Sequence, residues 1–433
     1  MEIKNLKKAG QRILKAIKNQ EKIILYGDAD LDGVSSVIIL EETIKSLANT
    51  IYNRQRVKNR RARSHISDER TDYIQRGGLL FVYFPDRGKE GYGLNFPALK
   101  LLKKDKPALL VTLDCGISNY EEAKLAKKLD FELIIIDHHE VLNNKLPQAS
   151  IIVDPKQKGD RSFFKEFATV GIAFKLVKII FHNNIPDDLQ IKFLQMVALG
   201  TIADMMKREK DNKIFVEEGF KYLKNSPIIA IKSFLKSSYI KNINEFSQKI
   251  TQIISLLNVR DVKNNLPISF RLLTASSLEN AEDIVEKLLC KNTIRKEKIK
   301  KIVREIETNR FNSEEPIILT GKSSWDLLLL GTAASIISRK YNKPTFLFKK
   351  DKDRIQGTSR TSKGFNLVRA MEKCAYYLKT YGGHPKAAGF SLKNKNLDKF
   401  KQCLIKYSKN LCPVRNRKGF RGLKTKYCFE REN

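Results

Sequence analysis

The sequence is poor in several residue types, and each scarcity limits what the chain can be. Only five His and one Trp occur among the 433 residues, and the six Cys show no paired spacing of a metal site. We therefore predict reduced thiols in a cytoplasmic protein rather than a disulfide framework. No apolar run approaches the ~20 residues that cross a bilayer, and the start of the chain lacks a signal-peptide core. We expect no membrane partner.

Acidic residues are also few relative to basic ones. Lys and Arg total 82 against 48 Asp and Glu, a formal net charge of +34. This excess favours a polyanionic partner, most simply nucleic acid, although a coding bias toward Lys, Ile and Asn would produce a similar composition. Hydrophobic residues make up 42% of the chain, enough to build cores, and this excludes disorder throughout.

The first two hundred residues alternate short apolar runs with helix-like stretches, the pattern of βαβ units around a mostly parallel sheet. Strands are predicted at 23–26, 80–84, 108–113 and 132–136. Acidic groups follow three of these strands, and in an open parallel sheet the carboxyl ends of strands gather along one edge. We therefore expect these acidic groups to converge.

The length and pattern predict an α/β protein with several parts. We assign 1–205 to a parallel-sheet domain, 206–310 to a helical connector and 311–410 to a smaller C-terminal α/β domain. Two basic segments, an insert at about 53–78 and a tail at 411–433, either contact nucleic acid or are solvated charge runs.

Carboxylates and imidazoles form the constellation that carries chemistry. Asp28, Asp30 and Asp32 alternate at a strand end, where their repulsion is costly unless cations neutralise it, although an Asp-rich turn is the alternative. The further candidates follow other apolar runs: Asp114, Asp137, His138, His139 and Asp204. Such a mixed set suits two divalent ions ~3.5–4 Å apart, Mn²⁺ in the first place and Mg²⁺ as the alternative.

Four of these segments resemble the motifs of the DHH phosphoesterase superfamily: DADLDG at 28–33, LDCG at 113–116, DHH at 137–139 and GTIAD at 200–204. Further segments are similar to RecJ-like single-strand-specific exonucleases: PDR at 85–87 with EGYGL at 90–94, VGIAFK at 170–175, GTSRT at 357–361, and GGH at 382–384 with AAG at 387–389. The matches come in family order.

The resemblance implies that 1–205 is the catalytic domain and that the active site lies in the cleft between the two α/β domains. It also implies metal ligands and catalytic residues. One ion would be held by Asp30 and Asp114, with Asp28 in or next to this site. The other ion would be held by four residues, one of them shared: Asp32, Asp114, His138 and Asp204. Asp137 would orient His138, and His139 would face the scissile phosphate. His384, from the C-terminal domain, would stabilise charge on the phosphoryl oxygens.

The resemblance also implies substrate-binding residues. Arg360 and Thr358 would receive a DNA phosphate near the 5′ end, because a guanidinium fork suits phosphate oxygens. Gly382 and Gly383 would permit close backbone approach to the strand. Arg87 is assigned to substrate binding as well.

The leading hypothesis is a divalent-metal-dependent exonuclease that degrades single-stranded DNA, 5′→3′, in repair or recombination, with RNA left open as a substrate and a helicase or single-strand-binding protein as candidate partners. The alternative is a DHH phosphodiesterase for short oligonucleotides or cyclic dinucleotides. A third hypothesis is a catalytically inactive homologue that only binds DNA.

The sequence departs from the family pattern at several points. Tyr26 stands where many superfamily members have a metal-binding His, and Asp326 follows Trp325 where a His is usual. In the connector, 256–260 keeps Asn258 and one Arg, Arg260, of a longer family segment. The family's OB-fold domain is expected to be absent, which puts processivity on long strands in doubt.

Overall fold

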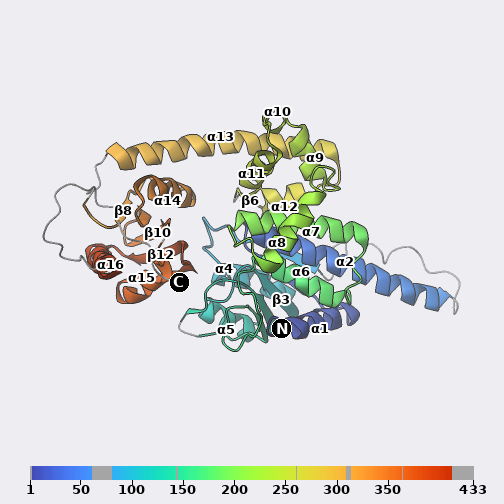
Figure 1. The fold of residues 1–433 in the computed structure, drawn as a ribbon. Coiled ribbons are helices and arrows are strands. Elements are labelled where there is room, and N and C mark those ends of the chain that lie inside the picture. Colours follow the sequence, from blue (N-terminus) through green and yellow to red (C-terminus); the bar gives the residue numbers. More distant parts are fainter. Residues whose placement is uncertain are drawn as a thin grey trace. The chain divides into compact units, whose positions relative to one another are not determined.

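The computed structural model describes residues 2–60, 80–142, 145–259, 261–308, 314–362 and 364–411, with backbone only for 52–60 and 410–411. The predicted tail from 412 and most of the predicted insert therefore lie outside the described residues. The chain divides into two compact units, Met1–Cys290 and Lys291–Asn433 (Figure 1). Each unit has its own sheet.

The first unit contains a five-stranded parallel sheet in the order β2-β1-β3-β4-β5. Its strands are β1 (Ile23–Gly27), β2 (Leu80–Tyr83), β3 (Ala108–Leu113), β4 (Phe131–Ile136) and β5 (Ile151–Val153). The prediction of a mostly parallel sheet is confirmed. β1 and β3 are buried along their whole lengths, as expected for a sheet covered on both faces.

Helices cover both faces of this sheet. Alternate residues of β1 point to opposite faces: Ile23 and Leu25 belong to one hydrophobic cluster, whereas Ile24 and Tyr26 belong to another. The first cluster includes side chains of α1 (Leu6–Lys18), α2 (Leu31–Arg60), α6 (Thr169–Ile180) and α7 (Asp187–Ala203). The second includes side chains of α4 (Phe96–Leu102) and α5 (Tyr120–Lys128).

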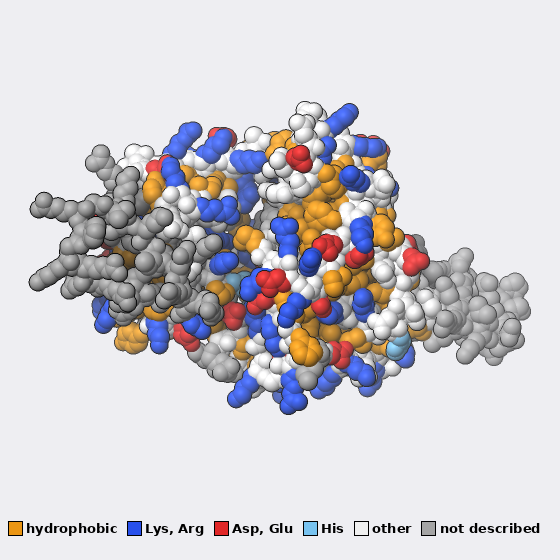
Figure 2. Space-filling view, in the orientation of Figure 1, with side chains coloured by type: hydrophobic (Ala, Val, Ile, Leu, Met, Phe, Trp, Pro, Cys, Tyr) orange, Lys and Arg blue, Asp and Glu red, His pale blue; other side chains and the backbone are white. Residues whose placement is uncertain are grey.

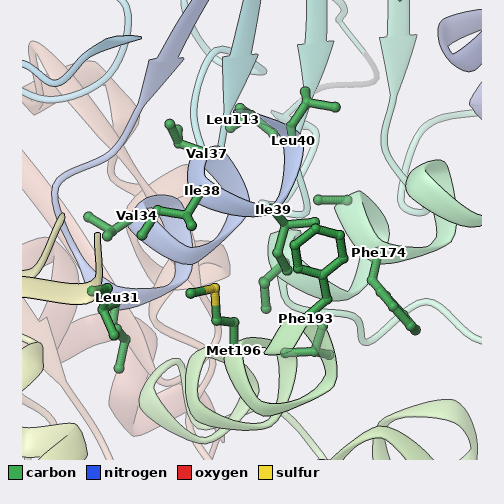
Figure 3. Close-up of a cluster of buried hydrophobic side chains, with 14 of the residues drawn as sticks. Leu31, Val34, Val37, Ile38, Ile39, Leu40, Leu113, Phe174, Phe193 and Met196 are labelled. Carbon is green, nitrogen blue, oxygen red and sulfur yellow. The ribbon is translucent and has the colours of Figure 1, made fainter. Parts of the chain in front are cut away.

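The packing of α2 fixes the start of the metal-site motif. Figure 3 shows Leu31, Val34 and Ile38 of this helix among Phe193 and Met196 of α7. All five side chains are buried, and burying each contributes roughly 1.5–3 kcal/mol. The first turn of α2, which carries Asp32, is therefore anchored in the core.

A helical connector follows α7, as predicted. It comprises α8 (Lys210–Lys221), α9 (Ile229–Lys236), α10 (Ser238–Lys241), α11 (Phe246–Leu257), the short strands β6 (Val262–Lys263) and β7 (Leu266–Pro267), α12 (Ile268–Leu273) and α13 (Leu278–Thr308). Gly219 lets α8 pack closely on α7, since a Cβ there would lie 2.4 Å from the carbonyl oxygen of Leu194.

The second unit contains a mixed sheet in the order β11-β12-β10-β9-β8, in which only the β8–β9 pair is parallel. Its strands are β8 (Ile318–Gly321), β9 (Thr345–Lys350), β10 (Arg354–Arg360), β11 (Thr380–His384) and β12 (Ala387–Lys393). Its helices are α14 (Leu327–Tyr341), α15 (Leu367–Lys373) and α16 (Leu397–Leu411). The predicted second α/β pattern is confirmed.

The prediction of reduced thiols is wrong for one pair. Cys374, just after α15, and Cys403, on α16, form a disulfide with a Cα–Cα distance of 5.9 Å. The two residues are 29 positions apart, so their proximity depends on how α15 and α16 pack and leaves no local signal in the sequence. Cys115 and Cys290 are free.

Charge and hydropathy on the outside of the described chain agree with its composition. Lys and Arg side chains are spread over the visible face of both units in Figure 2, and acidic side chains are less widespread there. No described helix combines the length and apolar character that a membrane crossing needs.

Candidate metal centre

The sheet of the first unit places four carboxylates at one edge. The strand register pairs Gly27 with Leu113, Leu113 with Ile136 and Ile136 with Val153. The residues that follow these positions are therefore neighbours, and all are buried: Asp28, Asp114, Asp137 and Asp154.

Asp154 was missed by the sequence analysis, because β5 is only three residues long and gives no strand pattern. Burial raises the pKa of Asp154 to about 8, so its carboxyl is mostly protonated at neutral pH. It therefore adds little negative charge to the cluster.

One candidate ligand set surrounds the imidazole of His138. Its Nε2 lies 3.3 Å from Asp114 Oδ1, 3.5 Å from Asp204 Oδ2 and 3.8 Å from Asp32 Oδ2. Burial lowers the pKa of His138 to about 3, which keeps the ring neutral and able to offer a lone pair. These are the four residues expected to hold one ion, and the structure brings them together.

A second candidate set lies beside the first. Ligand atoms of Asp28, Asp30 and Asp114 fall within 4.8 Å of one another, so Asp114 belongs to both sets. Arg87 interacts with this second set: its Nε donates to Asp28 Oδ1 at 2.8 Å, and its Nη2 lies 3.8 Å from Asp30 Oδ2. The carboxylate of Asp28 is thus engaged by a guanidinium.

The N-terminus of α6 holds the carboxylate of Asp32. The backbone N–H groups of Thr169 and Val170 donate to its two oxygens at 2.8 Å each, an arrangement that helix ends favour for anions. The Thr169 hydroxyl also donates to Asp114 Oδ1 at 3.1 Å. Thr169 was not among the predicted site residues, although it adjoins the family-like segment 170–175.

Burial is the largest influence on the pKa values of two of the candidate ligands, Asp114 and Asp32. It raises the pKa of Asp114 well above its usual value, and the charge of Asp32 adds to the shift. The pKa of Asp32 is raised in the same way, by burial and then by Asp204 and Asp30. Several carboxylates are thus crowded in a buried cluster, where nearby positive charge would stabilise their ionised forms.

The prediction that Asp137 orients His138 is wrong. The Nδ1 of His138 is 2.7 Å from the carbonyl oxygen of Phe167, whereas Asp137 Oδ1 lies 2.7 Å from Nδ1 of His139. Asp137 also accepts hydrogen bonds from the backbone N–H groups of both His residues and of Ile117. The ring of His138 is thus oriented by the backbone carbonyl of Phe167, just before α6, and not by the carboxylate of Asp137.

Asp137 and His139 form a charged pair. Burial acts against ionisation of both groups, but the charge of Asp137 raises the pKa of His139 to about 9, and that of His139 lowers the pKa of Asp137 to about 2. Asp114, Asp137 and His139 also have ligand atoms within 4.8 Å of one another. Because His139 and three backbone N–H groups already engage Asp137, we assign this group to hydrogen bonding rather than to metal.

Tyr92 is a further residue at this edge that the sequence analysis did not single out. Its hydroxyl lies 3.2 Å from His139 Nε2, and its ring centroid is 4.4 Å from the guanidinium carbon of Arg87. Nearly half of Tyr92 is exposed. The only sequence signal was its place in the family-like segment 90–94.

In the second unit, β10 carries two of the predicted substrate-binding residues. Arg360 Nη1 donates to the Thr358 hydroxyl at 2.9 Å and to the Ser359 carbonyl at 2.8 Å. Gly331 of α14 makes room for this guanidinium, because a Cβ there would lie 2.8 Å from Arg360 Nη2. Arg360 and Thr358 therefore form one polar group over α14.

The edge strand β11 carries Gly382, Gly383 and His384 in succession. A Cβ at Gly382 would meet no heavy atom within 4 Å, so this position is open. Gly383 has φ of 132° and a Cβ there would lie 2.5 Å from the Ala387 carbonyl oxygen, so its backbone requires glycine.

The departures from the family pattern have structural roles. The Tyr26 hydroxyl donates to the Gly93 carbonyl at 2.9 Å and accepts from the Asn95 amide at 3.0 Å inside the core. Asn258 accepts from the Leu31 N–H, next to the metal-site motif. Asp326 caps α14 through the Leu328 N–H. Arg260 lies outside the described residues.

The sequence comparisons match both units. Residues 22–201 match the N-terminal domain of the DHH family, and residues 314–410 match the DHHA1 domain. The single-stranded-DNA-specific exonuclease RecJ of Bacillus subtilis is 32% identical over 416 residues, covering 94% of this chain and 48% of that protein. RecJ of Haemophilus influenzae is 26% identical, covering 91% of this chain and 67% of that protein. The chain thus spans about half the length of the Bacillus relative.

Solved structures show the same fold. A crystal structure of exonuclease RecJ bound to manganese matches with a TM-score of 0.70 at 22% identity, covering 94% of this chain and 95% of that chain. RecJ of Thermus thermophilus in complex with Mn²⁺ matches with a TM-score of 0.74 at 20% identity, covering 95% of this chain and 55% of that chain. The chain therefore carries a DHH domain and a DHHA1 domain and has a RecJ-like fold.

Proposed function

We propose that this chain is a divalent-metal-dependent exonuclease that hydrolyses single-stranded DNA from the 5′ end in repair or recombination. The observation that carries the proposal is the pair of ligand sets that share Asp114 at one edge of the parallel sheet. The similarity to RecJ exonucleases, which are named as specific for single-stranded DNA, supports the substrate.

The residues present fit divalent ions. We propose that Asp30 and Asp114, with Asp28 beside them, hold one ion, and that a second ion is held by Asp32, Asp114, His138 and Asp204. Carboxylate oxygens with one imidazole suit Mn²⁺ and also Mg²⁺. Because the buried carboxylates are crowded, bound cations would stabilise their ionised forms. When bound, the ions would activate water and neutralise phosphoryl charge.

Metal binding should stabilise the first unit. A ligand at 100 times its Kd adds about 2.7 kcal/mol to the free energy of unfolding, which corresponds to about 5 °C in Tm for a domain of this size. We expect Mn²⁺ to raise Tm by about this much in a thermal-shift measurement and a chelator to reverse it. An equal shift from Ca²⁺, or no shift from Mn²⁺, would count against the proposed ligand sets.

The chain's own residues then act on the phosphodiester. Asp137 holds His139 by its Nδ1, which leaves Nε2 of the ring to donate to a phosphoryl oxygen of the substrate. The Tyr92 hydroxyl lies 3.2 Å from the same Nε2, and the phosphoryl oxygen would take its place when the substrate binds. We propose His384 as a second donor to the phosphoryl oxygens.

Three further groups would bind the strand. We propose that Arg360, positioned by Thr358, takes a phosphate near the 5′ end as a two-pronged donor. The open position at Gly382 and the glycine-specific backbone of Gly383 in β11 would let the protein backbone approach the DNA strand. Arg87 would bind a phosphate by exchanging Asp28 for phosphate oxygens.

The packing of Gly331 gives a direct test of Arg360. In Gly331→Ala the new methyl group must displace the guanidinium, because its Cβ would lie 2.8 Å from Nη2. Losing a hydrogen bond to a charged group costs about 1.5 kcal/mol or more, so binding of 5′-phosphorylated single strands should weaken about tenfold. Ile336→Ala, at an exposed position on the same helix, is the control. Equal affinity in both variants would remove Arg360 from the site.

The experiment that tests the function is digestion of end-labelled oligonucleotides with Mn²⁺ or Mg²⁺. We expect single-stranded DNA labelled at the 5′ end to release labelled mononucleotide at once, and a 3′-labelled strand to shorten gradually. Duplex DNA should resist digestion. Single-stranded RNA shows whether the enzyme accepts ribose as well as deoxyribose. Rapid cleavage of two- to five-nucleotide substrates with neglect of long strands would indicate an oligonucleotide phosphodiesterase instead.

A further inference from the structure

The turn between α15 and β11 presents a tyrosine ring to solvent. Tyr376 is 92% exposed, the highest value among the large hydrophobic side chains of the described residues. It lies in the 3₁₀ turn Ala375–Tyr377, four residues before β11 begins. Single exposed aromatic residues are common, so a function for Tyr376 has to be argued from the residues around it.

Hydrogen bonds fix the backbone of the turn. The Tyr377 N–H donates to the Cys374 carbonyl at 3.0 Å, and the Leu378 N–H donates to the Ala375 carbonyl at 3.0 Å. The ring of Tyr376 meets that of Tyr377 edge to face, with centroids 5.5 Å apart and an interplanar angle of 84°. The backbone under the exposed ring is thus ordered without a ligand.

Two further contacts tie the turn to the region around α16. The disulfide joins Cys374, at the start of the turn, to Cys403. The Asn396 side-chain amide donates to the Tyr377 carbonyl at 3.1 Å. A ligand that stacks on Tyr376 would therefore meet a surface already in place, with little ordering cost.

The charged residues around the turn indicate which kind of ligand it would bind. Between residues 372 and 386 the chain has three Lys and one Glu. Lys373 and Lys379 flank the turn and are exposed. An exposed aromatic ring between exposed cations is the combination that binds single-stranded nucleic acid without reading sequence.

The turn also leads into the strand proposed to bind substrate. β11 lies at the edge of its sheet, and a Cβ at Gly382 would have no heavy atom within 4 Å. We propose that Tyr376 is a base-stacking residue for a single strand that continues past β11, with Lys379 contacting the phosphate backbone. This inference rests on the proposed function, because it names a further contact of the same substrate.

The test uses the full chain with Asp114→Asn to prevent hydrolysis, and an oligothymidylate of roughly 16 nucleotides as the probe. Fluorescence anisotropy should show at least about fivefold weaker binding for Tyr376→Ala, whereas Tyr376→Phe and Tyr376→Trp should bind as the parent does. Tyr222→Ala, a 40% exposed tyrosine just after α8, is the matched control. Tm should not change in Tyr376→Ala, since the removed ring is exposed.

Salt dependence separates stacking from charge. Tyr376→Ala should weaken binding by the same factor at every salt concentration, while Lys379→Ala should reduce the slope of log affinity against log salt by about 0.7. A probe carrying 5-iodouracil should crosslink to Tyr376 under light. Unchanged affinity in Tyr376→Ala, with normal binding by the parent, overturns this inference alone; failure of the parent to bind the probe overturns the proposed function as well.

Discussion

Replacing Asp114 with Asn is expected to lower kcat on single-stranded DNA by at least about 10³-fold. Asp114 belongs to both ligand sets, so its loss disturbs both proposed ions, and such ions supply several kcal/mol of transition-state stabilisation. The variant should fold. Asn tolerates the left-handed backbone of Asp114, whose φ is 65°, and its side-chain oxygen can still accept from Thr169.

The metal-free stability of this variant separates a catalytic from a structural effect. Removing a negative charge from a crowded buried cluster relieves repulsion, so Tm without metal should be equal to or above that of the unchanged chain. The rise in Tm on adding Mn²⁺ should disappear. Asp130→Asn, at an exposed position that also has a positive φ of 59°, is the matched control and should keep both activity and the metal-induced shift. Retained activity in Asp114→Asn would refute the metal-centre proposal.

Local patterns were sufficient for four of the five strands of the first unit's sheet and for most of the candidate cluster. Asp28, Asp114 and Asp137 each follow a continuous apolar run, and the geometry of parallel strands alone brings such positions to one edge. Asp154 could not be found in this way, because three residues of β5 do not make a pattern.

Contacts between segments far apart in the chain were not accessible to the same reasoning. The partner of the His138 ring is a backbone carbonyl, at Phe167, and a carbonyl carries no mark in the sequence. The bond between Cys374 and Cys403 depends on the packing of two helices. The ion pair of Arg87 with Asp28 joins residues 59 positions apart. In each case the residue type allows several partners, and the tertiary structure determines which of them the residue contacts.

The second large effect is expected from His139→Ala, which should lower kcat by about 10²–10³-fold, the usual cost of removing one donor to developing charge on an oxygen. The ring is held at Nδ1 by Asp137, and its Nε2 lies 3.2 Å from the Tyr92 hydroxyl. Its removal therefore takes away the proposed donor to the phosphoryl oxygen. Single-turnover hydrolysis of a 5′-labelled strand at saturating Mn²⁺ measures this loss. His182→Asn, at a left-handed position after α6, is the control.

The metal response of His139→Ala distinguishes its role from that of Asp114. His139 belongs to neither proposed ligand set, so Mn²⁺ should still raise Tm by about 5 °C, whereas Asp114→Asn should show no rise. If His139→Ala also loses the metal-induced shift, the group formed by Asp114, Asp137 and His139 binds metal, and the ring is a ligand rather than a phosphate donor. Asp137→Asn adds a further check, because an amide cannot stabilise the charged ring and should reproduce part of the kinetic loss with metal binding intact.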